Sequence, residues 1–469
     1  MKLEPHVKRI AIAVVLGAIM SILSTTIVNV ALETLSEQLH EPLDGVQWVV
    51  TSYMLALAAV IPVSGWAAAR FGARRLYILS LALFTVGSLL CGLAWNLETL
   101  VGARVLQGLA GGLLVPIGQI ALVKAAGPHN MARVMSAIGV PMILAPVFGP
   151  TIGGLLVEHV SWQSIFFINI PVGLVAAVAS YRLFPRDEAQ PVEPLDFTGL
   201  VLVATGLVGI TYGLAESGTA GSLTASAVLV PALTGVALVT AFVVRALKIP
   251  NPLLDVRLYA NKAFSAASIT TFGLGAALFG GMVLMPLYFQ LVRGEDAVVT
   301  GLLLIPQGIG AAFAMHASGR LTERLGGGLT SLLGGSIMIV ATLPFVLIDA
   351  NTSYLLLGAA MVVRGFGIGL SMMPAMTAAY ATLRPEQIND ATPQLNVLQR
   401  VGGSIGTAIL TVVLQNGITA NTPTAIAASF AHTYWWVVGV SVVALLPTIL
   451  LAVVERRHLR ESEPVLVAA

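Results

Sequence analysis

Charged residues are scarce in this chain. Only 10% of its 469 residues are Asp, Glu, Lys or Arg, whereas 57% are hydrophobic, and the mean hydropathy is +0.90. A water-soluble domain of this length has too little interior to enclose so many apolar side chains. Lipid is therefore the expected solvent for most of the surface, and the expected fold class is an all-α polytopic membrane protein.

Cysteine and the motifs of soluble enzymes are nearly absent as well. The single cysteine, Cys91, excludes a disulfide framework and any cysteine-based zinc site, so its expected role is packing. The chain contains no H-E-x-x-H, no P-loop lysine motif and no EF-hand spacing. Gly402, Ser404 and Gly406 satisfy the G-x-S-x-G pattern of hydrolases, but in an apolar helical run, where packing is the expected role. We therefore predict no enzyme, no catalytic residue, no metal and no cofactor.

A strong excess of one charge is missing too. The net charge is +2, and the basic residues occur in short groups between apolar runs, which argues against a nucleic-acid partner. If the N-terminus is inside, the inside loops hold the groups around Arg70 and Arg324, while the outside loops hold only Arg293. This asymmetry predicts a multi-pass protein of the cytoplasmic membrane with both termini cytoplasmic.

Long apolar runs are what the chain has in abundance. Each is long enough to cross a hydrocarbon core of ~30 Å, and the first is too long for a signal-peptide core. Asp390, Gln399 and Arg400 make the thirteenth run the most polar. We predict fourteen transmembrane helices near 10–31, 46–69, 76–95, 100–123, 134–157, 165–184, 197–215, 223–247, 263–290, 298–318, 329–348, 354–380, 391–415 and 433–454.

Parts of the sequence recur about 254 to 260 residues apart. The loop sequence from Gly65 to Gly72 has a counterpart from Gly319 to Gly326, and Arg104 has a counterpart in Arg364. Repeated bundles around a midplane cavity are a transporter architecture that rocks between two openings. We predict two six-helix bundles, 1–186 and 263–455, with two inserted helices and linkers in 187–262 and a cytoplasmic tail in 456–469.

Four motifs carry a resemblance to a known family. They are the loop motif from Gly65 to Arg75, the sequence R-V-L-Q-G-L-A-G-G from Arg104 to Gly112, the glycines and prolines from Gly139 and Pro141 to Gly154, and the segment from Trp162 to Gly173. With them the chain resembles the major facilitator superfamily, specifically its fourteen-span drug:proton antiporter branch. The resemblance implies the major facilitator fold, transport without enzymatic activity, and roles for the motif residues.

Two sets of motif residues take their expected roles from the resemblance. Arginines of the loop motif can meet helix C-terminal carbonyls or acidic side chains and so hold one conformation; simple anchoring by positive charge is the alternative. The expected latch residues are Gly65, Arg70, Gly72, Arg74, Arg75, Glu323 and Arg324. Closely spaced glycines and prolines allow close packing and gating. The expected proton-coupling or gating residues are Arg104, Gln107, Gly108, Pro146, Gly149, Pro150, Gly153 and Gly154.

The chain departs from the family pattern in its first span. The branch carries an aspartate where this chain has Ser24, and Ala69 stands where the loop motif expects an acid. Serine does not titrate in the physiological range, and no acidic residue lies near the centre of any predicted span. A cavity with embedded arginines and no carboxylate disfavours lipophilic cations. The expected substrate is therefore hydrophobic and neutral, zwitterionic or anionic.

Polar and aromatic side chains supply the candidates for a substrate cavity, although hydrogen bonding between helices is an alternative role for the polar ones. The candidates are Ser24, Thr25, Asn29, Gln119, Tyr53, Tyr288 and Phe366.

Three functions remain open. The first is a proton-driven exporter of hydrophobic drugs or metabolites, the second is an exporter of one endogenous lipid, siderophore or antibiotic that is not coupled through the first helix, and the third is a non-transporting membrane sensor or scaffold. The expected partners are a hydrophobic small molecule, protons and membrane lipid, with no nucleic acid, and the expected state is a monomer.

Overall fold

The computed structural model describes residues 4–185, 193–420 and 422–462, and every regular element within them is a helix. Residues 187–192 of the predicted linker, 463–469 of the predicted tail and the side chain of Pro141 lie outside the described residues. The α-helices are α1 (Pro5–Thr26), α2 (Leu32–Leu39), α3 (Leu43–Val46), α4 (Trp48–Val60), α5 (Ser64–Phe71), α6 (Ala73–Gly92), α7 (Leu97–His159), α8 (Ser164–Phe167), α9 (Asn169–Leu183), α10 (Phe197–Ala220), α11 (Ser226–Lys248), α12 (Lys262–Leu291), α13 (Ala297–Leu325), α14 (Gly327–Thr342), α15 (Tyr354–Ala381), α16 (Ile388–Gly417) and α17 (Pro423–Ser462). The 3-10 helices are η1 (Ile27–Ala31), η2 (Ile61–Val63), η3 (Val256–Ala260), η4 (Leu343–Leu347) and η5 (Pro385–Gln387).

The helices match the predicted spans in order. Thirteen of them, within the described residues, are long and apolar enough to cross a membrane, and they correspond to predicted spans one to four and six to fourteen. The predicted fifth span, 134–157, is the second half of α7. Gly127, at φ 64° and ψ 174°, breaks the helical geometry and separates the two halves of α7. The prediction of an all-α polytopic protein is confirmed.

Polar side chains at the loop ends explain where several helices begin. Asn96 accepts from the backbone N–H of Thr99 at 3.0 Å at the start of α7, and the Thr99 hydroxyl accepts in return from the Asn96 N–H. Asp296 accepts from the Val299 N–H at 2.7 Å at the start of α13. Such caps satisfy backbone donors that have no partner within the helix.

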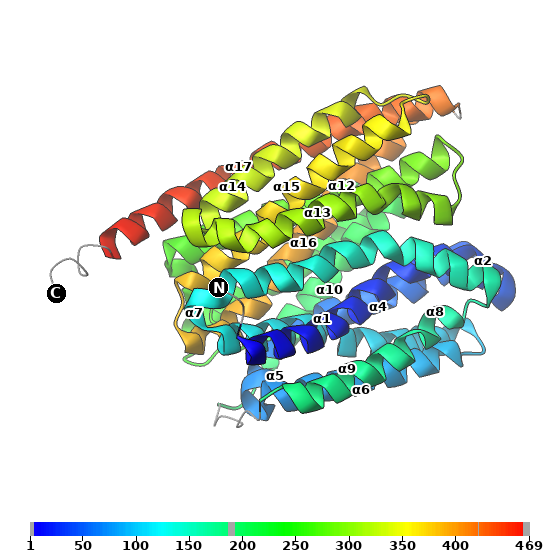
Figure 1. Cartoon of the computed structure of the whole chain (residues 1–469). Coiled ribbons are helices and arrows are strands. Elements are labelled where there is room, and N and C mark those ends of the chain that lie inside the picture. The colour runs from blue at the N-terminus through cyan, green and yellow to red at the C-terminus, as the bar shows by residue number, and fades with distance from the viewer. Residues whose placement is uncertain (1–3, 186–192, 421, 463–469) are drawn as a thin grey trace.

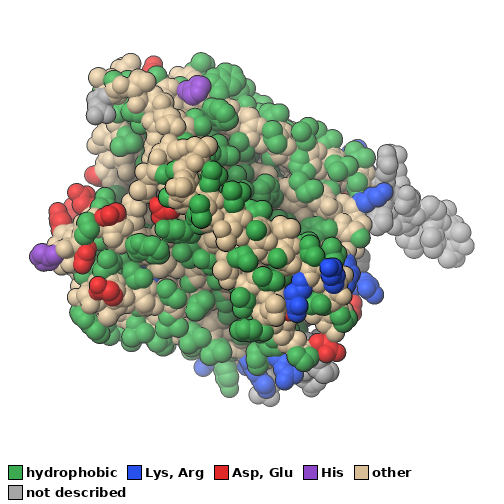
Figure 2. All heavy atoms as spheres, turned by 180° about the vertical axis from the view of Figure 1, so that it is seen from behind, with side chains coloured by type: hydrophobic (Ala, Val, Ile, Leu, Met, Phe, Trp, Pro, Cys, Tyr) green, Lys and Arg blue, Asp and Glu red, His purple; other side chains and the backbone are tan. Residues whose placement is uncertain are grey.

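The bundle has two chemically different ends. The start of α1 and the end of α17 lie at the same end (Figure 1). On the face in Figure 2, Lys and Arg gather near this end, whereas most Asp and Glu side chains lie at the opposite one. We call them the basic end and the acidic end. The basic end includes the loops after α5 and α13, with Arg70 and Arg324.

In Figure 1 helices α1 to α9, coloured blue to green-cyan, lie together on one side of the molecule, and α12 to α17, coloured green to red, lie on the other. We refer to these two groups as the first and the second bundle. Toward the acidic end each bundle has its own apolar core, around Phe166 in the first and around Phe289 in the second. A further core is shared, because it joins side chains such as Ile120 of α7 to Met376 of α15. We call the contact surface between the two bundles the seam.

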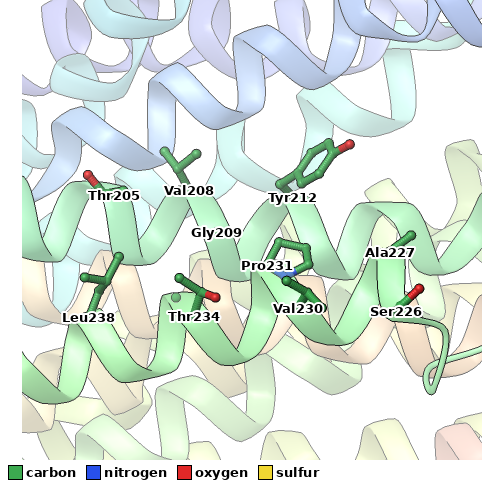
Figure 3. Close-up of a pocket in the computed structure, with 11 residues that line it drawn as sticks. Thr205, Val208, Gly209, Tyr212, Ser226, Ala227, Val230, Pro231, Thr234 and Leu238 are labelled. Carbon is green, nitrogen blue, oxygen red and sulfur yellow. The ribbon is translucent and has the colours of Figure 1, made fainter.

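The inserted helices α10 and α11 form a hairpin beside the seam. Glycines allow them to pack closely, since a Cβ on Gly206 would lie 2.9 Å from the Gly235 carbonyl oxygen. Asp196 and Arg245 pair at 2.9 Å at the basic end of the hairpin. On α10, Tyr212 stacks on Trp48 of α4, with ring centroids 5.8 Å apart. A groove of about 620 Å³ lies between α10 and α11 themselves, away from the seam (Figure 3).

Candidate functional site

Arg104 is fully buried in the first bundle, and every nitrogen of its guanidinium is hydrogen-bonded. Its Nε donates to the Val49 carbonyl at 2.8 Å, and its Nη1 donates to Ser24 Oγ at 3.0 Å and to Gln107 Oε1 at 2.6 Å. Its Nη2 donates to the Ser24 carbonyl at 3.3 Å. The charge also lies over the Tyr53 ring, 4.1 Å from its centroid. Helices α1, α4 and α7 are thereby joined by one side chain.

No carboxylate takes part in this network. The partners of Arg104 are neutral, and the ion pairs found among the described residues do not include it. Gln107 extends the network by donating to Ser88 Oγ at 2.6 Å, and Cys91 Sγ lies 3.8 Å from Gln107 Oε1. Ser24 therefore occupies the position from which the aspartate of the family pattern would reach Arg104.

Arg364, the counterpart in the second bundle, has different surroundings. It is also fully buried, and its Nη1 donates to Gln307 Oε1 at 3.1 Å. Its Nε and Nη2 have no hydrogen-bond partner, and the buried hydroxyl of Tyr434 also lacks one. The two bundles thus keep the arginine of the repeat but not the same set of hydrogen-bond acceptors around it.

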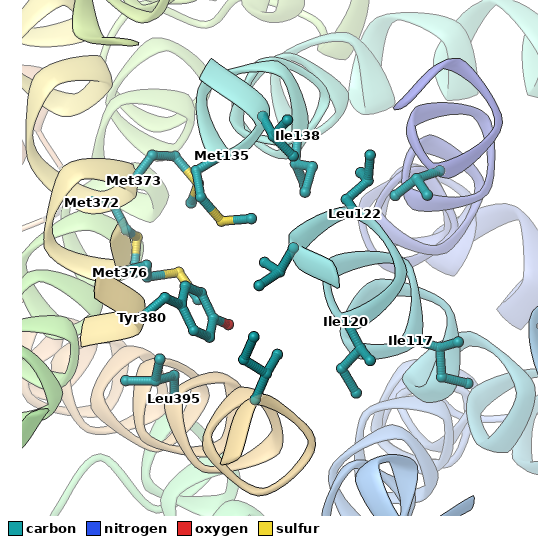
Figure 4. Close-up of a cluster of buried hydrophobic side chains, with 14 of the residues drawn as sticks. Ile117, Ile120, Leu122, Met135, Ile138, Met372, Met373, Met376, Tyr380 and Leu395 are labelled. Atoms are coloured by element: carbon teal, nitrogen blue, oxygen red, sulfur yellow. The ribbon is translucent and has the colours of Figure 1, made fainter. Parts of the chain in front are cut away.

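The basic half of the seam is closed by a cluster rich in methionine. Figure 4 shows Met135 of α7 next to Met373 of α15, with Met372, Met376 and Tyr380 of α15 and Leu395 of α16 on the same side. The same cluster includes Ile117, Ile120, Leu122 and Ile138 of α7. Methionine side chains are flexible and fit irregular gaps. Such side chains can repack when the helices around them shift.

Polar contacts cross the seam at two places within the described residues. Asn396 Nδ2 on α16 donates to Gln119 Oε1 on α7 at 2.6 Å, and both side chains are buried. Nearer the basic end, Arg133 Nη2 on α7 donates to Glu323 Oε2 on α13 at 2.6 Å. Glu323, an expected latch residue, is thus paired with the opposite bundle.

The glycines that end the two loop motifs have the same backbone conformation and the same position between two helices. Gly72 has φ 85° and Gly326 has φ 86°, a region that favours glycine, and each ends a helix just before the next one begins. A Cβ on Gly65 would lie 2.0 Å from the Asn389 carbonyl oxygen of α16, so α5 packs tightly on the other bundle. Gly319 packs on α7, where a Cβ would lie 3.3 Å from Arg133.

The arginines of the first loop motif have unequal contacts. Arg74 donates to the Tyr181 carbonyl in the last turn of α9 and lies over the Tyr181 ring, 5.0 Å from its centroid. Arg70, Arg75 and Arg324 are exposed, with no hydrogen bond or ion pair to any other described residue.

A residue that sequence reasoning missed lies beside the second loop motif. Glu455 of α17 accepts from the Gly327 N–H at 2.8 Å and from the Gly328 N–H at 2.5 Å at the start of α14. A carboxylate at a helix N-terminus is favourable. Its position near the end of the final apolar run gave no signal of this contact.

The glycines expected in gating pack on α4, on α1 and the following η1, and on α13. A Cβ on Gly108 would lie 2.5 Å from the Tyr53 carbonyl of α4. A Cβ on Gly149 would lie 2.1 Å from Thr26 Oγ1, and one on Gly153 would lie 2.9 Å from the Ile27 carbonyl. Gly154 faces Val298 of α13, across the seam. The helix continues through Pro146 and Pro150, so this face of α7 joins α1 to the second bundle.

The expected cavity residues do not all come together. Ser24 and Tyr53 contact Arg104, and Gln119 lies in the seam. Thr25 is partly buried and donates to the Ser21 carbonyl at 3.0 Å, while Asn29 in η1 is exposed.

The two aromatic candidates of the second bundle lie elsewhere. Tyr288 belongs to the core near the acidic end, where its hydroxyl donates to the Asp349 carbonyl at 2.6 Å. Phe366 lies one turn from the exposed Val362 and Val363, on the outward side of α15.

Arg400 is an embedded charge of the thirteenth predicted span and is not among the expected site residues. It lies one turn from Asn396 on α16 and is partly buried. Tyr53 of the first bundle lies within electrostatic reach of it. The sequence signal was available, because an arginine in an apolar span requires protein or water around it.

Two helical bundles, a seam closed at one end and buried polar side chains at that seam define a polytopic membrane protein with the architecture of a transporter. The model of the Major Facilitator Superfamily matches residues 14–407. The chain therefore belongs to that superfamily, whose members are transporters and not enzymes.

Two of the similar proteins are named for drug resistance or drug export. The multidrug resistance protein B homologue of Mycobacterium tuberculosis is 41% identical over 419 residues, which cover 88% of this chain and 77% of that protein. The multidrug export protein EmrB of Haemophilus influenzae is 29% identical over 411 residues, covering 87% and 80%. The crystal structure of the human organic anion transporter MFSD10 aligns with a TM-score of 0.65 over 96% of this chain and 100% of that one. At 14% identity this last likeness establishes the fold alone.

Proposed function

We propose that this protein is a secondary active exporter of hydrophobic drugs or metabolites, driven by proton antiport, with neutral or anionic substrates favoured over cationic ones. The substrate preference rests on the charges near the seam. Arg400 faces the seam and Arg104 lies behind Tyr53, and no described carboxylate pairs with either arginine. An uncompensated positive charge raises the free energy of a lipophilic cation in a water-poor cavity. The names of the relatives support drug export.

The proposed arrangement places the basic end in the cytoplasm and the exporter in the cell membrane as a monomer surrounded by lipid. The distribution of Lys and Arg in Figure 2 supports this orientation. In the described conformation the cytoplasmic side of the seam is then closed. Export requires that the methionine-rich cluster and the Arg133–Glu323 pair separate to admit substrate from the inside.

Proton coupling in this proposal does not run through α1. Ser24 and the other partners of Arg104 stay neutral over the physiological range. The proposed sequence is that a proton from the acidic medium reaches the seam and favours a different conformation.

Purified protein in liposomes tests the proposal. An imposed pH gradient is expected to accelerate the flux of an uncharged hydrophobic dye and to leave a quaternary ammonium dye nearly unmoved. Flux that ignores the gradient favours the exporter of one endogenous lipid, siderophore or antibiotic. No flux of any compound favours a sensor or scaffold, and a clear preference for the quaternary ammonium dye contradicts the proposed charge selectivity.

A further inference from the structure

The three embedded arginines differ in how many hydrogen-bond acceptors the protein provides for their guanidinium groups. Arg104 has acceptors for all of its nitrogens, and Arg364 has one acceptor inside the second bundle. Arg400 makes no hydrogen bond or ion pair with another described residue, yet it is only partly buried. Its guanidinium therefore borders space that another molecule can enter, whereas the other two are enclosed.

The position of Arg400 is fixed by its helix. On α16, Gly402 and Gly406 pack on α12, where a Cβ would lie 2.1 Å from the Phe272 carbonyl and from the Ala276 carbonyl, respectively. Asn396, four residues before Arg400, bonds to Gln119 of the opposite bundle. Arg400 thus lies on the face of α16 that is turned to the first bundle, one turn farther from the basic end than this cross-seam hydrogen bond.

The side chains around Arg400 match an amphiphilic ligand. Ser404 and Thr407 follow Arg400 on the same face of α16 and are partly buried, so they extend a polar stripe toward the acidic end. Toward the basic end the apolar cluster of Met372, Met376 and Ile120 supplies a hydrophobic surface. A charged donor with five N–H groups between a polar stripe and an apolar floor suits a hydrophobic molecule with one carboxylate.

We infer that Arg400 binds the carboxylate of monoanionic hydrophobic substrates at the seam. Tyr53 of the first bundle is fully buried but lies within electrostatic reach of Arg400. It is held by Arg104 on its ring and by a hydrogen bond from its hydroxyl to the Ser21 carbonyl at 2.9 Å. This inference rests on the proposed function and narrows its substrates from neutral or anionic compounds to carboxylates. Arg104 then positions Tyr53, and Arg400 is the residue that contacts the substrate.

Matched ligands test the inference on the purified full-length protein. Pyrenebutyrate and pyrenebutanol share one apolar body and differ in a carboxylate against a hydroxyl. Saturable energy transfer from tryptophan to pyrene reports their binding. The wild type is expected to bind pyrenebutyrate at least tenfold more tightly than pyrenebutanol. Arg400→Gln is expected to remove that preference and to leave pyrenebutanol binding within about twofold, whereas Arg400→Lys retains part of it.

Controls separate this idea from the exporter proposal and from misfolding. Arg293→Gln removes an arginine near the acidic end that donates to the Thr352 carbonyl, and it is expected to leave both affinities unchanged. Equal losses for both pyrene compounds in Arg400→Gln, despite a monodisperse protein, overturn the inference. So does a wild type without preference for pyrenebutyrate. In either case, export of an uncharged dye under a pH gradient still supports the proposed function, and its absence contradicts that function separately.

Discussion

Arg104 Nη1 donates a hydrogen bond to Ser24 Oγ at 3.0 Å, and this contact joins α7 to α1 without a negative charge. In the branch that the chain resembles, an aspartate stands at the position of Ser24. The place in this protein where a carboxylate would neutralise an arginine is therefore occupied by a neutral acceptor, and the positive charge of Arg104 remains uncompensated.

Ser24→Asp is expected to change the substrate range. The new carboxylate lies within reach of Arg104, and a charge-assisted hydrogen bond of about 1.5–3 kcal/mol offsets part of its desolvation. Efflux of the cation ethidium from energised cells is expected to rise severalfold, because the field of Arg104 is neutralised. Ser24→Asn is the matched control of similar size. Equal ethidium efflux in the two variants would show that charge at this position does not select substrates.

Arg104 and Arg364 are expected to differ in their contribution to stability. Arg104→Met leaves the acceptors of Val49, Ser24 and Gln107 without their donor, at about 1–3 kcal/mol for each one that finds no replacement. Arg364→Met removes a buried charge whose Nε and Nη2 are unpaired, a change that is often neutral or stabilising by ~1–4 kcal/mol.

Thermal unfolding of the purified variants measures this difference. The midpoint for Arg104→Met is expected to fall by several degrees, while that for Arg364→Met stays level or rises. Both arginines are fully buried and receive the same substitution, so each serves as the other's control. A larger fall for Arg364→Met would mean that its free nitrogens have a partner in solution.

The sequence predicted the helices well because a membrane span requires a continuous apolar run, and such runs can be read locally. It also located Arg104 and Ser24, because motif residues keep their spacing along one helix. The sequence could not predict contacts across the seam, because the partners are far apart in the chain. Asn396 and Gln119 are 277 residues apart, and Arg133 and Glu323 are 190 residues apart.

Residue type alone did not predict which side chains line the seam, because the helix face that each one occupies was unknown. Tyr288 and Phe366 were selected as aromatic residues, and the structure places one in the core near the acidic end and the other on the outward side of α15. Arg400 was the opposite case. Its charge was visible in the sequence, but the face it occupies became known only from the packing of its neighbours on α12 and α7.

The Arg133–Glu323 pair is expected to bias the seam toward closure at the basic end. Both side chains are partly exposed, at 22% and 29%, so the pair contributes only ~0.2–1 kcal/mol. Glu323→Gln should therefore raise the open population by up to about fivefold. Maleimide labelling of Met376→Cys reports opening, with little background because Cys91 is buried.

An exchange of charges provides the control for that experiment. Arg133→Glu with Glu323→Arg rebuilds an ion pair of opposite polarity across the seam, so labelling is expected to return toward the wild-type rate. Labelling that stays as fast in the exchanged protein as in Glu323→Gln alone would assign the effect to something other than this pair.

Gly65→Ala is expected to hinder closure of the basic end by steric conflict. The added methyl would lie 2.0 Å from the Asn389 carbonyl oxygen, a backbone atom that cannot turn aside, so α5 and α16 must separate. Gly319→Ala places its methyl 3.3 Å from Arg133, where a shift of a few tenths of an ångström suffices, and it should be nearly silent. Gly102→Ala has nothing within 4 Å and serves as a further control, with a gain of roughly 0.5–1 kcal/mol in helix stability.

The order of Met376→Cys labelling rates should be Gly65→Ala well above Gly319→Ala, with Gly102→Ala equal to the parent, and transport rates should be reduced in Gly65→Ala alone. If Gly65→Ala and Gly102→Ala behaved alike in both measurements, close packing of α5 on α16 would not be part of the transport cycle.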